Sequence, residues 1–175
     1  MTTAIKTEVE EYKIYVACLA SYNNGCLHGK WIDATQGAEE VKEEINKMLK
    51  ASPEFGAEEF AIHDFDLGGC RIDEYENIDE VCELAEALEE SDNPEILADL
   101  YNEFGLETAV DMIENESVGE YESYEEYGIS LTQDQGDLPI HYEYYFDYEK
   151  YGEEMAMDYH VVEDENHNLH FFINN

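Results

Sequence analysis

The stretch YKIYVACLASYNNGCLHGKWI (Tyr12–Ile32) decides the class of fold, because it predicts two strands joined by a turn. Its first part, Tyr12–Leu19, is rich in aromatic and β-branched residues, which favour strands. The tripeptide NNG at residues 23–25 is a turn signal, and Cys26–Ile32 is the predicted returning strand. The start of the chain is therefore expected to form an antiparallel pair.

A helix and a third strand are predicted after this pair. Apolar residues recur at helical spacing over Ala38–Lys50, and Glu59–Phe65 (EFAIHDF) has the composition of a strand. Together these segments predict a small N-terminal α+β domain, residues 1–66. Residues 1–11 are expected to be a polar leader with the composition of a disordered segment.

Three amphipathic helices are predicted in the middle of the chain, over Ile78–Glu90, 94–104 and 106–115. Each has apolar residues on one face and acidic residues on the other, as a helix at a protein surface does. Proline at the first position of the second helix and glycine just past its end match the usual helix termini. These helices make up a predicted central acidic domain, residues 67–116.

The remainder of the chain, residues 117–175, is rich in tyrosine and less regular in pattern. It predicts a helix around Tyr145–Met157 and a closing hairpin of Tyr159–Val162 with Leu169–Ile173. The predicted fold class is therefore α+β, with three small domains in an elongated arrangement. The third domain is a C-terminal α+β domain, residues 117–175.

The distribution of charge is the most informative feature of the composition. Between Arg71 and Lys150 there is no lysine or arginine, although that interval of 78 residues carries 26 Asp and Glu. The net charge of the whole chain is −37, yet its first 50 residues hold six basic and eight acidic residues. Adaptation to high salt would acidify every surface, so it does not explain this asymmetry. A folded chain with so much self-repulsion is expected to use its field for binding.

The composition excludes several classes of protein. An apolar fraction of 43%, with 14 Tyr and 7 Phe, is typical of a globular protein rather than of a disordered acidic tail. No stretch approaches the roughly 18 apolar residues of a membrane helix, and the N-terminus lacks a signal pattern. The four cysteines match no zinc or redox spacing, so reduced, buried thiols in a cytoplasmic protein are expected.

The candidate binding surface is the set of carboxylates on the outer faces of the acidic segments. A helical row places a carboxylate about every 5 Å, and one strand of duplex DNA carries a phosphate about every 3.4 Å. Two neighbouring rows therefore approach the charge density of a duplex, which indicates a mimic of nucleic acid. The predicted acidic surface consists of Asp73, Glu74, Glu76, Asp79, Glu80, Glu83, Glu86, Glu90, Glu95, Asp99, Glu103, Glu107, Asp111, Glu114, Glu120, Glu122, Glu125 and Glu126.

Other interpretations of the same carboxylates stay open at this point. Any single acidic row can be no more than the solvated face of a helix. The charge also suits an acidic scaffold or chaperone, which would bind cationic proteins without needing a defined shape. An enzyme that uses a carboxylate pair would need a concave pocket, which the sequence does not reveal.

No metal or cofactor is predicted. His167 and His170 have a spacing that could chelate an ion, but residues three apart in a hairpin point to opposite faces. The loop at residues 132–137 is too short for an EF-hand. The tyrosines either pack in the core or form a self-association surface. The residues predicted for that surface are Tyr142, Tyr144, Tyr145 and Phe146.

Three stretches resemble the ArdA antirestriction proteins carried by mobile genetic elements, namely IYVACLASYNNGCLHGKWID (Ile14–Asp33), EEFAIHDFD (Glu58–Asp66) and YFDYEKYGEE (Tyr145–Glu154). They occur in the right order and span the chain. The resemblance implies an elongated protein of three domains that catalyses no reaction and forms a homodimer through its C-terminal domain. It also implies that the partner is the DNA-binding groove of a type I restriction-modification enzyme, whose restriction and often modification are blocked. Neither a nucleic acid nor a membrane is an expected partner.

Overall fold

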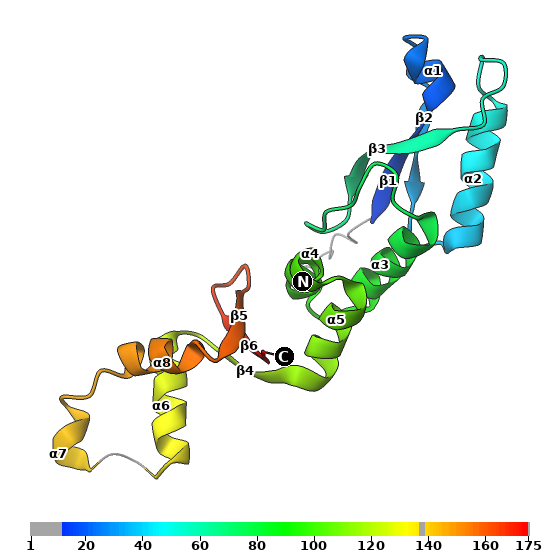
Figure 1. Ribbon diagram of the computed structural model, residues 1–175. Coiled ribbons are helices and arrows are strands. Elements are labelled where there is room, and N and C mark those ends of the chain that lie inside the picture. Colours follow the sequence, from blue (N-terminus) through cyan, green and yellow to red (C-terminus); the bar gives the residue numbers. More distant parts are fainter. Residues whose placement is uncertain (1–11, 137–138, 175) are drawn as a thin grey trace, which may run out of the picture. The chain divides into compact units, whose positions relative to one another are not determined.

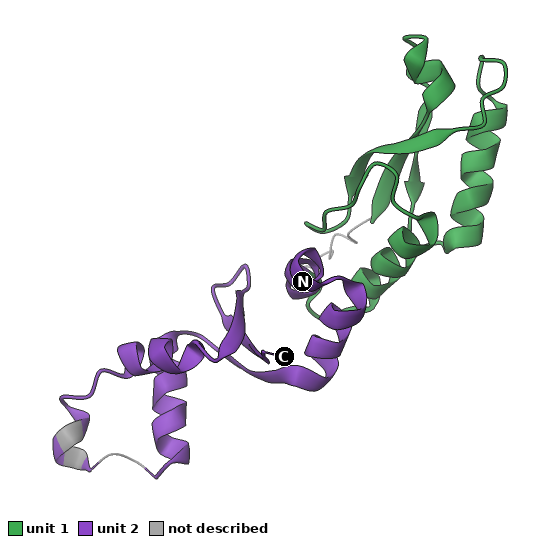
Figure 2. Cartoon of the chain, in the orientation of Figure 1, with its two compact units in different colours: residues 1–94 green, residues 95–175 purple. Residues whose placement is uncertain are grey.

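The computed structural model describes residues 12–136 and 139–174 (Figure 1). The chain divides into two compact units, residues 1–94 and 95–175 (Figure 2). Both contain helices and a small antiparallel sheet, so the predicted α+β class is confirmed. The division into three domains stays a prediction, and the predicted leader, residues 1–11, lies outside the described residues.

The first unit is a three-stranded sheet with helices beside it. Its sheet order is β2-β1-β3, and both pairs are antiparallel. The helix α2 packs on the sheet through its buried apolar stripe of Val41, Ile45, Met48 and Leu49. The elements of this unit are β1 (Lys13–Cys18), α1 (Leu19–Asn23), β2 (Gly29–Asp33), α2 (Ala38–Lys50), β3 (Phe60–Asp66) and α3 (Ile78–Glu90).

The connection between β1 and β2 differs from the simple turn that the sequence predicts. The chain first makes the short helix α1, and the returning strand begins at Gly29 rather than at Cys26. The Ser21 side chain is fully buried, and its hydroxyl lies 2.8 Å from that of Ser52. This part-buried hydrogen bond joins α1 to the segment that follows α2. Gly25 then takes a positive φ of 76°, as the turn requires.

The second unit contains a second three-stranded sheet, with order β4-β6-β5 and antiparallel pairing throughout. The predicted helix at residues 145–157 and the closing hairpin are confirmed, as α8 with β5 and β6. The predicted helix at residues 106–115 instead changes to π-helical hydrogen bonding after Asp111. The elements are α4 (Pro94–Phe104), α5 (Leu106–Asp111), η1 (Met112–Glu116), β4 (Ser117–Tyr121), α6 (Tyr124–Asp134), α7 (Ile140–Glu143), α8 (Tyr148–Ala156), β5 (Tyr159–Glu163) and β6 (Leu169–Ile173).

Aromatic rings fill the core between α6, α8 and one face of this second sheet. Tyr127 is 1% exposed, and its ring centroid lies 4.3 Å from that of Phe171, which is fully buried. Tyr121, Tyr124 and Tyr159 are partly buried and pack around the same cluster. These tyrosines therefore belong to the core, which is one of the two roles that the sequence left open.

Glycines form the crossing between α6 and α8. A Cβ atom added to Gly128 would lie 2.1 Å from the carbonyl oxygen of Tyr148, and one added to Gly152 would lie 1.9 Å from that of Tyr124. The contacts are reciprocal, and the two helices begin with related sequences, YEEYG (124–128) and YEKYG (148–152). Backbone therefore packs directly on backbone at this crossing, where a side chain has no room.

Candidate functional site: the acidic helix faces

All eighteen residues of the predicted acidic surface lie in the described part of the chain, and none of them is buried. Fifteen are exposed, while Glu76, Asp79 and Glu95 are half-buried. They lie on elements of both units, so we consider each element by itself. The structure thus gives these carboxylates access to solvent, whereas their role in binding a partner stays a prediction.

The helix α3 carries the longest acidic row. Its inner face is fully apolar, with Ile78, Val81, Cys82, Leu84, Ala85 and Leu88 buried. Because of the helical period, Glu80, Glu83, Glu86 and Glu90 fall outside that face, and all four are exposed. Ten residues separate the first from the last, so these four carboxylates are distributed over about 15 Å of helix axis. Burial of the inner face fixes the direction in which this row points.

Asp79 is an exception within the predicted surface, because a lysine faces it. The Nζ atom of Lys42, on α2, lies 2.5 Å from the Oδ1 atom of Asp79. The hydrogen bond to Asp79 raises the pKa of Lys42, although partial burial acts in the opposite direction. This ion pair joins α2 to the N-terminal turn of α3 and offsets one charge of the row.

Burial and the negative charges on α3 together raise the pKa of the Cys82 thiol. Burial is the main reason that the pKa of Cys82 is raised to about 11, and the negative charges of Glu86 and Asp79 add to it. Lys42 acts against this shift. The carboxylates on the outer face of α3 therefore make ionisation of a thiol on its buried face less favourable.

Further carboxylates line an open hollow on α5 and η1. Glu107, Asp111 and Glu114 line it together with Thr108 and Val110. The Nδ2 atom of Asn115 donates a 2.7 Å hydrogen bond to the Oδ1 atom of Asp111. On α4, Asp99 is exposed, and the Oε2 atom of Glu103 lies 3.7 Å from the Nε2 atom of His160. The structure therefore brings Glu107, Asp111 and Glu114 together, as the predicted helical row requires.

The acidic residues after β4 include one with a structural role. Glu120 is exposed on β4, and Glu122 and Glu125 are exposed nearby. Glu126 accepts a 2.6 Å hydrogen bond at its Oε2 atom from the backbone N–H of Glu122. Its own backbone N–H donates to the Ser123 hydroxyl, 3.2 Å away, so it completes the N-terminal cap of α6. Glu126 therefore stabilises a helix start as well as adding charge.

The segment before α3 holds Asp73, Glu74 and Glu76 beside the first sheet. The backbone N–H of Ile62 on β3 donates to the Glu74 carbonyl oxygen at 2.9 Å. The side chain of Glu74 lies 3.6 Å from the Nε2 atom of His63. Sequence reasoning left out Glu89 and Asp92, which are also exposed in the acidic tract. The helical spacing of Glu89 from Glu86 could have identified it.

The predicted self-association residues lie around α7. Tyr144 is 88% exposed and Tyr145 is 82% exposed, and their ring centroids are 5.3 Å apart. Phe146 is half-buried and packs its ring against Tyr148 and Tyr151. The side chain of Tyr142 lies outside the described residues. Tyr144 and Tyr145 thus present an aromatic surface, and its use in dimer formation stays a prediction.

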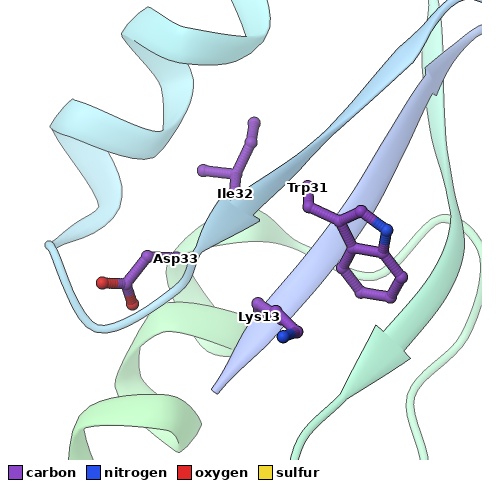
Figure 3. A pocket seen from close by; sticks show the side chains of 4 residues that line it. All are labelled: Lys13, Trp31, Ile32 and Asp33. Atoms are coloured by element: carbon purple, nitrogen blue, oxygen red, sulfur yellow. The ribbon is translucent and has the colours of Figure 1, made fainter. Parts of the chain in front are cut away.

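A pocket on the first sheet differs in character from the acidic helices (Figure 3). It is lined by Lys13, Trp31, Ile32 and Asp33. The Lys13 Nζ atom lies 5.8 Å from the centroid of the Trp31 ring, within reach of a cation–π contact. Among the described residues Asp33 is the one carboxylate that lines the pocket, so those residues supply no carboxylate pair for acid–base chemistry. In the part of the chain that the structure describes, no helix is long and apolar enough to cross a membrane.

Comparison with known proteins identifies the family of this chain. The model of the protein family described as "Antirestriction protein (ArdA)" matches residues 14–167. That range contains every residue of the predicted acidic surface and runs from β1 to the turn between β5 and β6. No curated protein matches the chain.

Proposed function

Because this chain belongs to the ArdA family of antirestriction proteins, we propose that it inhibits type I restriction-modification enzymes by occupying their DNA-binding groove. The observation that carries this proposal is the acidic tract between Arg71 and Lys150, which has no interleaved lysine or arginine and places many of its carboxylates on exposed helix faces. The acidic faces would take the place of the phosphate backbone.

The way in which proteins hold DNA without reading its sequence explains why an acidic surface would be sufficient to compete with it. A groove that holds DNA presents lysine and arginine to the phosphates, and these contacts carry no sequence information. A competitor therefore needs charge at the right spacing and does not need to imitate the edges of bases. The four exposed carboxylates on α3 lie about 5 Å apart along the axis, somewhat wider than the phosphates of one DNA strand. The acidic residues on the other helices would add to this charge.

Inhibition by occupancy requires no chemistry, so we propose that the protein is not an enzyme and uses no cofactor. We propose further that it acts in the cytoplasm, where restriction of incoming DNA takes place, and that it does so as a homodimer. Self-association would use the exposed aromatic side chains of Tyr144 and Tyr145. Two copies would present twice the net charge of −37 to one large enzyme.

A competition assay tests the proposal. The purified protein is titrated into a type I restriction-modification enzyme bound to labelled DNA, at low and moderate salt. We expect displacement of DNA at near-stoichiometric protein, weakening steeply with salt because the contacts replace phosphate contacts. Displacement that is indifferent to salt, or no displacement at all, would contradict the proposal.

Matched charge variants show whether position matters. In the first variant, Glu80, Glu83, Glu86 and Glu90 on α3 are replaced by Gln. In the second, Glu39, Glu40, Glu43 and Glu44 on α2 are replaced by Gln, which changes the net charge equally on a helix that also carries lysines. We expect the α3 variant to inhibit roughly 30-fold or more weakly, from four lost ionic contacts, and the α2 variant to change little.

The runner-up function, an acidic scaffold or chaperone for cationic proteins, predicts another result. A chaperone would respond to net charge alone, so the two variants would lose binding equally. It would also bind unrelated basic proteins, such as histones, as tightly as the restriction enzyme. Equal losses in the two variants would therefore favour the chaperone.

A further inference from the structure

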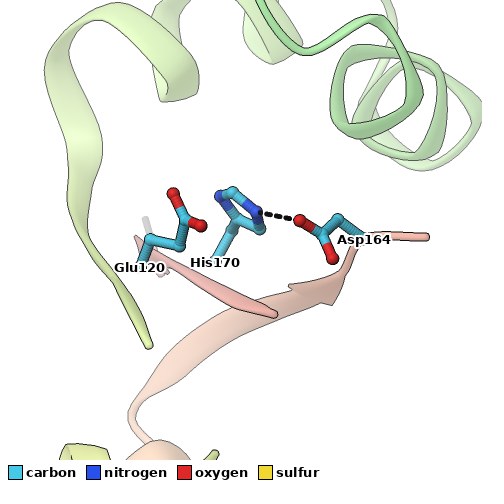
Figure 4. A group of neighbouring side chains, drawn as sticks. All are labelled: Glu120, Asp164 and His170. Carbon is cyan, nitrogen blue, oxygen red and sulfur yellow. Dashed lines mark hydrogen bonds and ion pairs between the residues drawn. The ribbon is translucent and has the colours of Figure 1, made fainter. Parts of the chain in front are cut away.

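Three metal-ligating side chains meet on one face of the second sheet, outside the helical rows described above (Figure 4). They are Glu120, Asp164 and His170, and their candidate ligand atoms all lie within 4.8 Å of one another. We propose that these three side chains bind one divalent metal ion of the zinc class. This inference is independent of the proposed function, because it rests on the C-terminal sheet alone.

The strand register holds the three residues together. Glu120 on β4 and His170 on β6 are direct partners across an antiparallel pair, so their side chains project from the same face of the sheet. On the other side of β6, Val162 of β5 pairs with His170, and Asp164 follows directly after the end of β5. The ligands therefore come from three separate segments that the sheet hydrogen bonds hold in place.

Asp164 is oriented in the manner of a metal-binding carboxylate. Its Oδ1 atom accepts hydrogen bonds from the backbone N–H groups of Asn166 and Asn168, both at 2.8 Å. Its Oδ2 atom accepts a 3.0 Å hydrogen bond from the Asn168 side chain and lies 3.3 Å from the Nε2 atom of His170. These hydrogen bonds fix the direction of the Asp164 carboxylate towards His170.

Burial separates this cluster from the many exposed carboxylates of the chain. The side chains of Asp164 and His170 are 9% and 12% exposed, whereas that of His167 in the same hairpin is 86% exposed. His167 is paired instead with Glu163. The two histidines whose spacing suggested chelation thus lie in different surroundings. The sequence predicted no metal site, because Glu120 is far from His170 along the chain and only the pairing of β4 with β6 brings the two together.

The donor set selects the class of ion. One imidazole nitrogen and two carboxylate oxygens suit Zn²⁺, which takes these ligands at about 2.0–2.2 Å, whereas Ca²⁺ and Mg²⁺ take oxygen ligands. Ligand atoms of a tetrahedral zinc site lie ~3.4 Å apart, so separations of up to 4.8 Å in this cluster must shorten by as much as about 1.4 Å. Glu120 is exposed and can make that movement. A water molecule would complete the coordination.

A zinc titration of the full-length protein tests this site. Zn²⁺ alone is the probe, with a large excess of Mg²⁺ present to occupy the diffuse acidic surface. Calorimetry measures affinity and stoichiometry, and long-range proton–nitrogen spectra report which imidazole binds. We expect one Zn²⁺ per chain with a nitrogen shift at His170. The variants His170→Asn and Glu120→Gln should each bind about 100-fold more weakly, since each removes a direct ligand.

The matched control is His167→Asn, which removes an imidazole from the same turn. Its φ of 68° is one that asparagine tolerates, so the turn is expected to keep its shape. This variant should bind zinc as the natural chain does. Equal affinity in the natural chain, His170→Asn and Glu120→Gln would overturn the proposal, as would a nitrogen shift at His167 in place of His170. Because Glu120 is exposed, Glu120→Gln keeps the test valid should His170→Asn fail to fold.

Discussion

Replacing Gly152 by alanine should destabilise the second unit, although alanine is the better helix former. The added Cβ atom would lie 1.9 Å from the carbonyl oxygen of Tyr124 and 3.2 Å from the backbone nitrogen of Gly128. A carbon and a carbonyl oxygen approach no closer than about 3.3 Å, so the two helices must separate by about 1.4 Å. Overpacking of this kind costs ~1–3 kcal/mol or more. The higher helix propensity of alanine offsets only about 1 kcal/mol of this loss of stability.

We therefore expect Gly152→Ala to lower the free energy of unfolding by about 2 kcal/mol. Urea unfolding followed by the near-ultraviolet circular dichroism of the tyrosines reports on the aromatic core beside this crossing. The fluorescence of Trp31, the single tryptophan of the chain, reports on the other unit as an internal reference.

The control is Glu153→Ala, an exposed position one residue further along α8, where a change within about 0.5 kcal/mol is expected. Gly128→Ala, whose Cβ would lie 2.1 Å from the carbonyl oxygen of Tyr148, should behave like Gly152→Ala. A Gly152→Ala protein that is more stable than the natural chain would show that helix propensity outweighs the close crossing, and would refute the reasoning.

Four further predictions concern charge, capping and ionisation. Added salt should raise the melting temperature of the free protein by about 5 °C or more, because it screens the repulsion within the acidic tract. Ser123→Ala should cost about 1 kcal/mol in urea unfolding, since its hydroxyl caps α6. Burial, followed by neighbouring tyrosines, raises the pKa of Tyr127 from 10.0 to about 12, so folding stability should fall as the pH rises through that interval. In a native thiol titration, the exposed Cys26 should react and the buried Cys82, with its pKa of about 11, should not.

Each of these four predictions would be contradicted by a specific result. A melting temperature that does not change with salt would show that the carboxylates do not repel one another appreciably. A Ser123→Ala protein of unchanged stability would exclude the cap as a stabilising contact. For the alkaline transition, Tyr127→Phe is the control, because the pH dependence should shrink when the hydroxyl is absent. Rapid modification of Cys82 in the native protein would contradict its burial.

Hydrophobic periodicity predicted the helices of the chain wherever apolar side chains form the buried face. The bounds predicted for α2, α3 and α4 agree with the structure, because their buried stripes consist of apolar residues at helical spacing. The same reasoning missed α6. Its buried positions are Tyr127 and Gly128, and a glycine at a close helix crossing contributes no hydrophobic signal. The strand β4 was missed with it.

The candidate sites, like the fold, were predicted from the sequence only where local periodicity determines them. The helical phase of α3 was sufficient to predict which of its carboxylates face solvent. The pairing of Asp79 with Lys42 could not be predicted, because 37 residues separate them and the contact depends on how α2 packs against α3. The cluster of Glu120, Asp164 and His170 depends on strand register, which the irregular pattern after Glu116 did not reveal.

The helices α3 to α6 contain no lysine or arginine, and this limits which reactions can act on them. Trypsin has no cleavage site between Arg71 and Lys150, so digestion should release residues 72–150 as a single peptide. Amine-directed labels and cross-linkers can attach only outside residues 72–149. Acetylation, which acts by neutralising lysine, has no target within this range either. A cell could therefore change the charge of these helices only by modifying other side chains or through the ions that surround them.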